Sequence, residues 1–395
     1  MNSTSAGTLA IIGAGQLGFF LCNAARELGL RTLVVTADAA APALGFADDA
    51  LVTPLDAPDL AAAIAARAQF ATFEFENVPD ALLEDLAQLQ AKGQIAVRPD
   101  PAVLSLLKNK ARQKRWLAEH GFPTLPFEVF DEAPADAAAG LTRVRPPLVQ
   151  KAQQGGYDGY GVQVLKTEAD LQRFWPVPSL VEPFLHDVRE IAVLAARGVS
   201  GDIKVYAPTD LEFEPAGNIL SWVAAPAALP AALQASAVKL AADIVSTLNG
   251  VGVFAVEMFL VADAASPGGQ LVVNEISPRV HNAGHHTLES CPTSQFAQHV
   301  RAVTGMPLGD VEQTAPATMH NLLYRDALAS LRVFGAERVP TADPAVALHW
   351  YGKREARPGR KMGHVTCTGL APEAAKQRIS VTLSALTSVP KGATA

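Results

Sequence analysis

Two apolar segments decide the fold, and each carries one acid: Phe254-Ala255-Val256-Glu257-Met258-Phe259 and Val272-Val273-Asn274-Glu275-Ile276. Both read as strands, and Ser266-Pro267-Gly268-Gly269 between them is a turn signal. If the two strands form a simple hairpin centred near residue 266, Glu257 pairs with Glu275. Directly paired residues of antiparallel strands point to the same face of the sheet.

Two carboxylates that face each other among apolar neighbours repel one another unless they share a proton or a cation. Mg²⁺ held by Glu257, Glu275 and substrate phosphates is the natural solution, because this ion prefers oxygen ligands. Asn274 would add a neutral oxygen beside them. The alternative is a register shifted by one residue, which would leave one acid facing water.

A glycine-rich loop follows the strand expected at 148–151 and reads Gly155-Gly156-Tyr157-Asp158-Gly159-Tyr160-Gly161. Its glycines would let backbone N–H groups close on phosphate oxygens, and Lys151 stands just upstream as a cation for the same phosphates. The alternative is a surface hairpin without a ligand.

A second glycine loop opens the chain, where Gly13-Ala14-Gly15-Gln16-Leu17-Gly18 lies between an expected strand at 9–12 and helix at 16–28. With a further strand at 31–36 this predicts a β-α-β unit. The loop matches the dinucleotide fingerprint, and Asp38 stands where a ribose-binding acid would be. An NAD-dependent dehydrogenase is therefore an open alternative, although the same turn serves other phosphates or tight packing.

Polar residues are dense directly after the second acidic strand. Arg279 can neutralise an oxyanion, and His281 and Asn282 can orient a polar substrate. A zinc site at His281 and His285 would lack a third ligand, so none is expected. Further on, a turn at Pro358-Gly359 would bring Lys353 and Arg360 together around one phosphate monoester. A solvated basic hairpin is the alternative there.

The composition is that of a globular protein with two or three domains: 395 residues, 49% hydrophobic and 18% charged. Its net charge of −7 argues against nucleic acid and anionic membranes as partners. Three scattered cysteines indicate a reducing compartment, and neither a secretory signal nor an 18-residue apolar span is apparent. We expect a cytoplasmic protein.

The element pattern predicts a fold of the α/β and α+β classes. It consists of a Rossmann-like front domain (residues 1–105), a large α+β middle (106–310) and a small β-rich end (311–395). One basic helix is expected over 99–120, an Ala-rich helix over 231–248 and another over 293–303. Short strands and turns are expected beyond residue 315.

Three segments in combination resemble one family. They are Gly155 to Gly159, the run Asn274-Glu275-Ile276-Ser277-Pro278-Arg279-Val280-His281-Asn282-Ala283-Gly284-His285, and Arg357-Pro358-Gly359-Arg360-Lys361-Met362-Gly363-His364. They look like the 5-(carboxyamino)imidazole ribonucleotide synthases, ATP-grasp ligases of purine biosynthesis. The resemblance implies an ATP-grasp fold with an N-terminal pre-ATP-grasp domain. It also implies ATP-dependent carboxylation of 5-aminoimidazole ribonucleotide by bicarbonate through carboxyphosphate, with ATP and magnesium bound, in a homodimer.

The resemblance also implies roles for individual residues. ATP would contact Arg98, Lys151, the loop Gly156, Tyr157, Asp158, Gly159, Tyr160, Gly161 and Val162, the adenine-edge residues Glu182, Pro183, Phe184 and Leu185, the ribose-binding Glu190, and Asn274 with Glu275. The metal would be held by Glu257 and Glu275 with Asn274. The ribonucleotide would meet Gln16, Leu17, Glu76, Lys353, Arg360 and Lys361. The reacting groups would be surrounded by Tyr157, Asp158, Arg279, His281 and Asn282.

The chain departs from the family pattern in places. Asn109-Lys110 replaces the usual Asp-Arg, and residues 211–213 lack the histidine often found there. A formate-using glycinamide ribonucleotide transformylase on the same scaffold is the nearest alternative. A catalytically inactive nucleotide-binding regulator is another, although it would not need the magnesium carboxylates.

Overall fold

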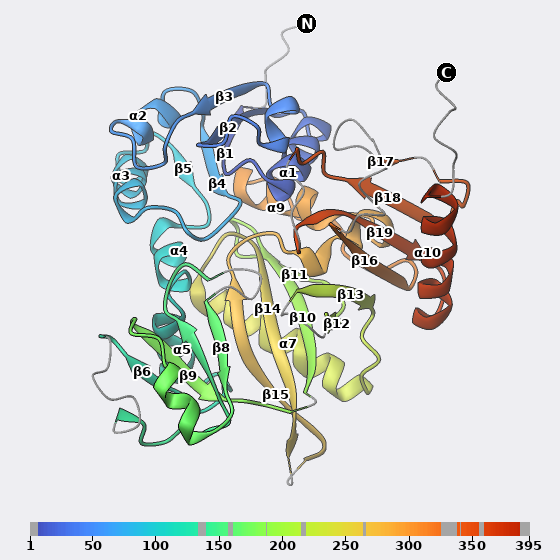
Figure 1. Ribbon diagram of the computed structural model, residues 1–395. Coiled ribbons are helices and arrows are strands. Elements are labelled where there is room, and N and C mark those ends of the chain that lie inside the picture. The colour runs from blue at the N-terminus through green and yellow to red at the C-terminus, as the bar shows by residue number, and fades with distance from the viewer. Residues whose placement is uncertain are drawn as a thin grey trace, which may run out of the picture.

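The N-terminal part is a parallel sheet of the Rossmann type (Figure 1). The structure, a computed structural model, describes residues 7–132, 140–156, 161–186, 188–214, 219–263, 266–324, 338–339, 341–354 and 359–387. The sheet has the order β3-β2-β1-β4-β5, built from β1 (Thr8–Ile12), β2 (Arg31–Thr36), β3 (Asp49–Val52), β4 (Phe70–Phe73) and β5 (Ala96–Val97). The predicted β-α-β opening is confirmed.

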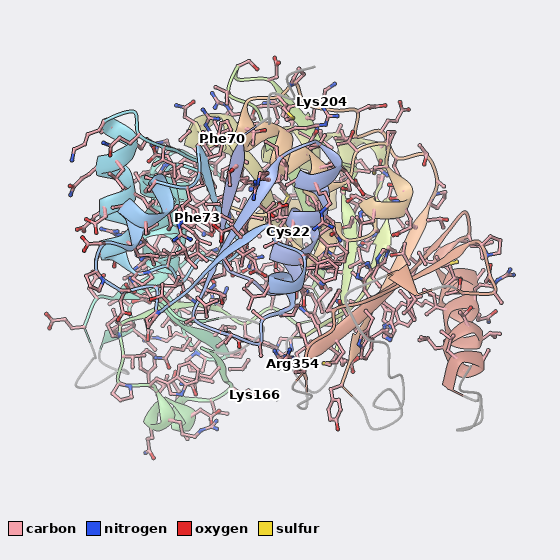
Figure 2. All side chains as sticks on the ribbon, turned by 90° about the horizontal axis from the view of Figure 1, so that it is seen from above. Cys22, Phe70, Phe73, Lys166, Lys204 and Arg354 are labelled. Atoms are coloured by element: carbon pink, nitrogen blue, oxygen red, sulfur yellow. The ribbon has the colours of Figure 1, made fainter. Side chains whose placement is uncertain are left out.

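Helices cover both faces of this sheet. The covering helices are α1 (Gln16–Glu27), α2 (Leu60–Ala65) and α3 (Asp80–Ala91), with a 3-10 turn η1 (Pro42–Gly45). One core forms under α2 and α3, while α1 packs against α9 (Gln295–Thr304) of the next part. Figure 2 views this region from above and labels Cys22 on α1 and Phe73 on β4, both of which are buried.

The single basic helix expected over 99–120 is wrong, because the segment forms two helices. They are α4 (Pro101–Leu107) and α5 (Lys110–Glu119). Asn109 interrupts them with an extended backbone, and its side chain accepts a hydrogen bond from the N–H of Arg112, which caps the second helix. The break aims α5 at the acidic strands, so it positions Lys110 and Lys114.

A small antiparallel sheet follows, with the order β6-β9-β7-β8. Its strands are β6 (Glu128–Phe130), β7 (Leu148–Ala152), β8 (Val162–Leu165) and β9 (Ser179–Pro183), with a 3-10 helix η2 (Glu168–Arg173). β7 and β8 pair in register on either side of the glycine loop. Lys151 on β7 and Glu182 on β9 thus lie on the same face of this sheet.

The largest sheet begins with β15-β14-β10-β12-β13, and β11 pairs with β10. These strands are β10 (Arg189–Arg197), β11 (Ile203–Val205), β12 (Thr209–Phe213), β13 (Leu220–Ala225), β14 (Gly252–Asp263) and β15 (Ser266–Ser277). The predicted helix α7 (Ala231–Leu248) covers one face. It is long and apolar enough to cross a membrane, but one side of it packs in the core of this sheet. The opposite face carries the acids.

Glu257 pairs with Glu275 as predicted, by a less direct route than a simple hairpin. The expected turn at Ser266 to Gly269 is wrong, because these residues belong to β15 and Ser266 pairs with Asp263. Two register shifts separate this pair from the acids. One shift lies between Glu257 and Met258, where Glu257 faces residue 275 and Met258 faces residue 273. Asn274 is therefore the extra residue of a β-bulge, a feature that redirects side chains beside functional sites.

The C-terminal part extends the largest sheet. β16 (Ala317–Leu323) pairs with β13, and β19 (Lys361–Thr368), β18 (Val346–Trp350) and β17 (Arg338–Val339) follow outward. The loop before it holds η3 (Asn282–Gly284) and α8 (Thr287–Ser290). The expectation of only strands and turns beyond residue 315 is wrong, because α10 (Pro372–Thr387) packs across β16 and β19. The β-rich character is confirmed.

Candidate active site

Three acids lie on one face of the largest sheet. Glu257 and Glu275 are direct partners, and Glu257 also pairs with Ala192, two residues from Glu190 on the same side of β10. Burial, and then the negative charge of Glu257, raises the pKa of Glu190 to about 7. The carboxyl of Glu190 is thus poorly solvated and lies close to a second negative charge. Oxygen donors crowded in this way fit a hard divalent cation.

The bulge residue Asn274 turns toward the small sheet. Its Oδ1 accepts a hydrogen bond from Lys151 Nζ at 2.9 Å. The contact joins β15 of the large sheet to β7 of the small one, so the site lies between two sheets. Asn274 is a partner of the lysine here, while Glu257 and Glu275 carry the charge that fits a cation.

Glu182 is clamped between two lysines. Its oxygens lie 2.6 Å from Lys114 Nζ and 2.6 Å from Lys151 Nζ, and its side chain is 1% exposed. Burial raises the pKa of Glu182, but the two lysines outweigh burial and leave it below the usual range. This carboxylate is therefore engaged by Lys114 and Lys151.

Lys110 reaches the acid pair from α5, with Nζ 2.6 Å from Glu275 Oε1. Burial raises the pKa of Glu275, but Lys110 and then Lys151 lower it to about 2. Lysines from two different elements thus converge on one acidic strand. Two lysine ammonium groups held at one strand in this way can bind the phosphates of a nucleotide.

The glycine loop between β7 and β8 is described only at its two ends. Gly156 and Gly161 lie close together, since a Cβ added to Gly161 would be 3.1 Å from Gly156 Cα. Ala152 donates its N–H to the carbonyl of Gly161 at 2.8 Å, which closes the base of the loop. Tyr157, Asp158, Gly159 and Tyr160 lie outside the described residues.

Two further contacts involve residues that were predicted to surround the reacting groups, and the first of them crosses between domains. Arg279 Nε lies 2.8 Å from Glu76 Oε1, which joins the end of β15 to the loop after β4. His281 Nε2 lies 3.1 Å from Glu257 Oε1. The structure therefore brings the residues expected around the reacting groups next to both the ribonucleotide candidate Glu76 and the metal candidate Glu257.

The loop that carries His281 and Asn282 is held by two amide side chains. Gln295 accepts from the N–H of His281 at 2.8 Å and donates to its carbonyl at 2.7 Å. Asn282 and Asn321 exchange two amide hydrogen bonds, at 3.0 and 2.6 Å. Sequence reasoning missed Gln295 and Asn321, because both become neighbours of the loop only in the folded chain.

The C-terminal basic residues meet the first glycine loop. Lys353 Nζ donates to Gln16 Oε1 and to the carbonyl of Lys361, both at 2.7 Å. Arg360 precedes Lys361 at the entry to β19. The predicted substrate residues of the first and last domains are thus adjacent, although residues 355–358, within the same segment, lie outside the described residues.

Glu74, which sequence reasoning missed, fills the first glycine loop. Its carboxylate oxygens accept the N–H groups of Gly15 at 2.6 Å and Leu17 at 3.1 Å. These are the groups that a dinucleotide pyrophosphate would need, so the NAD alternative loses its binding site. The signal in the sequence was the pair of acids, Glu74 and Glu76, after a buried strand.

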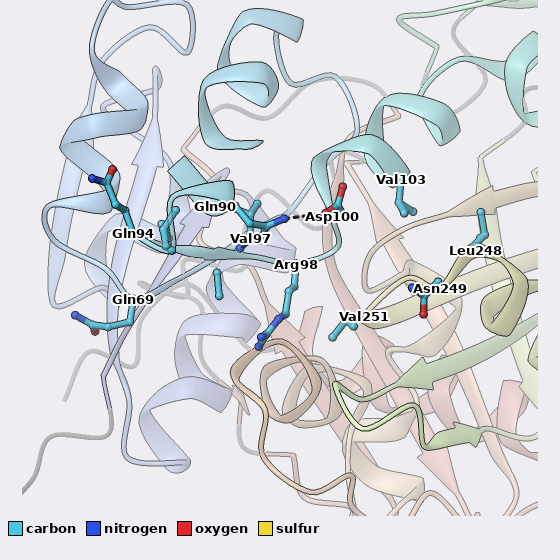
Figure 3. Close-up of a pocket in the computed structure, with 13 residues that line it drawn as sticks. Gln69, Gln90, Gln94, Val97, Arg98, Asp100, Val103, Leu248, Asn249 and Val251 are labelled. Carbon is cyan, nitrogen blue, oxygen red and sulfur yellow. Dashed lines mark hydrogen bonds between the residues drawn. The ribbon is translucent and has the colours of Figure 1, made fainter. Parts of the chain in front are cut away.

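Arg98 contacts the backbone of α9 rather than the lysine–carboxylate cluster, and its predicted contact with ATP stays a prediction. Its Nη1 donates to the carbonyl of Val303 at 2.7 Å. The side chain lines a hollow with Asn249 and Val251, beside the end of α7 (Figure 3). Arg98 thus fastens the N-terminal domain to the end of α9, and Lys110 is the cation that reaches the acidic strand instead.

A small and a large antiparallel sheet meet at a cluster of lysines and carboxylates. This arrangement is that of an ATP-grasp protein. Residues 115–296 match the family of ATP-grasp domains, residues 6–108 the ribonucleotide synthetase preATP-grasp domain, and residues 317–378 the phosphoribosylaminoimidazole carboxylase C-terminal domain. The N5-carboxyaminoimidazole ribonucleotide synthase of Synechococcus elongatus is 37% identical over 367 residues, which cover 91% of this chain and 88% of that one. The chain belongs to the N5-carboxyaminoimidazole ribonucleotide synthase family, as the sequence resemblance indicated.

Solved structures agree. An ADP complex of an N5-carboxyaminoimidazole ribonucleotide synthetase has a TM-score of 0.85 at 29% identity, covering 97% of this chain and 98% of that one. The Aspergillus clavatus synthase in complex with ADP and 5-aminoimidazole ribonucleotide has a TM-score of 0.82 at 26% identity, covering 97% and 99%. The predicted ATP-grasp fold with its additional N-terminal and C-terminal domains is confirmed.

Proposed function

We propose that this chain carboxylates 5-aminoimidazole ribonucleotide with bicarbonate at the expense of ATP, releasing ADP and phosphate, in de novo purine biosynthesis. The observation that carries the proposal is the convergence of Lys110 and Lys151 on the acidic strand β15. The preserved family membership over nearly the whole chain supports the same reaction.

ATP would lie between the small and the large sheet. Lys151, fixed by Glu182 and Asn274, and Lys110, fixed by Glu275, would neutralise its phosphates. Glu190 would accept hydrogen bonds from the ribose, and the main chain of residues 183–185 would face the base. Gly156 and Gly161, at the base of the glycine loop, would let the loop close over the phosphates and exclude water.

Glu257 and Glu275 would hold magnesium, which when bound neutralises charge on the phosphates and orients the transferred group. The two carboxylates lie on the same face of the sheet, because they are register partners. Asn274 contributes through Lys151.

The acceptor side of the site would bind the ribonucleotide and bicarbonate. Lys353, Arg360 and Lys361 would hold the substrate phosphate, with Gln16 and Leu17 of the first glycine loop beside it. Arg279 would hold bicarbonate and then the carboxyphosphate formed when a bicarbonate oxygen attacks the terminal phosphorus of ATP. Carboxyphosphate would release carbon dioxide and phosphate, and the substrate amine would capture the carbon dioxide.

His281 and Asn282, with Tyr157 and Asp158 of the glycine loop, would surround the amine. His281 stands beside Glu257, so it is placed to accept the proton that the amine loses on carboxylation. Gln295 and Asn321 would keep this loop in position. Enclosure by these groups matters because carbon dioxide must be captured before it escapes.

ADP release measured with each substrate omitted in turn tests the function. We expect turnover only when 5-aminoimidazole ribonucleotide and bicarbonate are both present. Replacing bicarbonate by formate, and the ribonucleotide by glycinamide ribonucleotide, should abolish turnover. ADP release with the formate pair, and none with the bicarbonate pair, would instead establish the transformylase.

We infer also that the protein works as a cytoplasmic homodimer without nucleic-acid or membrane partners. The acidic net charge and the family resemblance support this assignment. Light scattering of the purified chain should give twice the 41.5 kDa chain mass. A monomer at micromolar concentration would contradict it.

A further inference from the structure

The carboxylate of Glu74 occupies the space that the first glycine loop encloses. The side chain leaves the end of β4 and lies under the loop, and the residue is only 7% exposed. Its Oε2 accepts the N–H of Gly15 and its Oε1 accepts the N–H of Leu17. Both belong to the entry of α1, where free N–H groups and the helix dipole favour an anion.

The three glycines of the motif are each required by Glu74. A Cβ added to Gly13 or Gly15 would lie 2.5 Å from a Glu74 carboxylate oxygen, and one added to Gly18 would lie 3.1 Å away. These glycines ordinarily let a loop approach an external pyrophosphate. Here they make room for the Glu74 side chain. The motif is therefore an anion-binding loop, called the cradle below, and its anion is the carboxylate of Glu74.

The cradle also sets the position of the predicted ribonucleotide residues. Gln16 lies between the two residues whose N–H groups Glu74 binds, and its side chain meets Lys353 of the C-terminal part at 2.7 Å. Burial raises the pKa of Glu74, while the backbone N–H groups and then Lys353 oppose that effect. The loop is thus held by Glu74 through its backbone N–H groups and by Lys353 through the Gln16 side chain.

We propose that Glu74 is a positioning and specificity-determining residue. By filling the cradle it excludes dinucleotides and other external pyrophosphates from the N–H groups of the loop. The phosphate of a mononucleotide would then bind to Lys353, Arg360 and Lys361 instead of to the loop. Glu74 also holds Gln16 and Leu17 in the position in which they contact that mononucleotide. The exclusion stands on geometry alone, whereas the effect on the ribonucleotide rests on the proposed function.

Chemical rescue of E74A tests the proposal, because acetate matches the group that this substitution removes. Without acetate, we expect a lower melting temperature than wild type and a KM for the ribonucleotide raised about tenfold or more, as for a lost charged hydrogen bond. The KM for ATP should stay within about twofold, since ATP lies across the other two sheets. Saturating acetate should restore both the melting temperature and the KM, and sodium chloride at equal ionic strength should not.

D48A is the matched control. Asp48 also accepts a backbone N–H, that of Thr32, but at the opposite end of the same parallel sheet. We expect D48A to lose stability without a rise in the KM for the ribonucleotide and without rescue by acetate. If D48A showed the same KM increase and the same rescue, Glu74 would be an ordinary stabilising residue and the proposal would be overturned.

E74Q keeps the volume but turns an amide N–H₂ toward one of the two backbone N–H groups. It should raise the KM for the ribonucleotide like E74A, which keeps the test valid if E74A does not fold. An unchanged KM in E74Q would overturn the positioning role. If the wild type showed no turnover with the ribonucleotide, the proposed function would fail, and thermal rescue of E74A by acetate would still decide whether the cradle is an anion site.

Discussion

Lys110 Nζ lies 2.6 Å from Glu275 Oε1, which ties the first turn of α5 to the acidic strand 165 residues further on. The Glu275 side chain keeps 37% of its surface exposed, so solvent partly screens this ion pair. The contact matters less for stability than for holding the Lys110 ammonium at the acidic strand, where we propose that the ATP phosphates and magnesium bind.

Replacing Lys110 by methionine should weaken nucleotide binding. We expect K110M to raise the KM for ATP about tenfold, as for a lost charge-assisted contact, and K110R to stay near wild type. R98M is the contrasting variant, because Arg98 contacts Val303 and not the acidic strand. Initial rates of ADP release would measure both, and a larger KM effect in R98M than in K110M would contradict the structural assignment.

Removing the charge of either paired acid should remove magnesium-dependent turnover. We expect E257Q and E275Q each to lower kcat about a hundredfold or more, because phosphoryl transfer relies on electrostatic stabilisation by the ion. A magnesium titration of ADP release measures the effect. D243N, an exposed acid on α7 paired with Lys239, is the control and should behave as wild type. Full magnesium-dependent activity in E275Q would refute the metal assignment.

The clamp of Lys114, Glu182 and Lys151 should be costly to break. E182Q removes the carboxylate that directly contacts both buried lysines, so we expect a loss of about 3 kcal/mol in the free energy of unfolding. The loss in the double variant K114M/E182Q should be smaller than the sum of the two single losses, because the partners are coupled. Urea unfolding measures this cycle. R115M, which breaks the exposed Arg115–Asp131 pair, should cost at most about 0.5 kcal/mol.

His299 should make the contact between domains sensitive to acid. Its Nδ1 accepts the N–H of Val253, and its Nε2 lies 2.7 Å from Thr72 Oγ1 on β4. Burial lowers its pKa to about 3 from the ordinary 6.5. Between these two pH values the unfolded chain binds a proton that the folded chain refuses, so stability falls as pH falls from 6.5 to 3.

H299N should remove this contribution from the pH dependence. In that window we expect the slope of unfolding free energy against pH to be smaller by up to about 1.4 kcal/mol per pH unit, the value for one proton. Denaturant unfolding at a series of pH values measures the slope. H120N is the control, because His120 is exposed on the surface. An unchanged slope in H299N would show that His299 is not the group responsible.

Local pattern was enough to predict most elements near the site. The alternation around Glu257 and Glu275 predicted the paired strands, and the strand–glycine–helix run at residues 9–28 predicted β1 and α1. The local pattern failed at residues 99–120. The segment is rich in helix-forming residues, so the pattern does not reveal that Asn109 ends one helix and caps the next. It also failed at the end of the chain, where α10 depends on packing against β16 and β19.

The acid pair shows where the limit lies. The sequence by itself determined which strands carry the acids and that their side chains share a face, and it predicted a cation and a nucleotide there, because periodicity and residue chemistry are local properties. Only the tertiary structure decided that Asn274 bulges toward Lys151, that Lys110 rather than Arg98 reaches Glu275, and that Glu74 fills the first glycine loop. Those choices depend on contacts between residues far apart in the chain, which form only when the sheets are packed together.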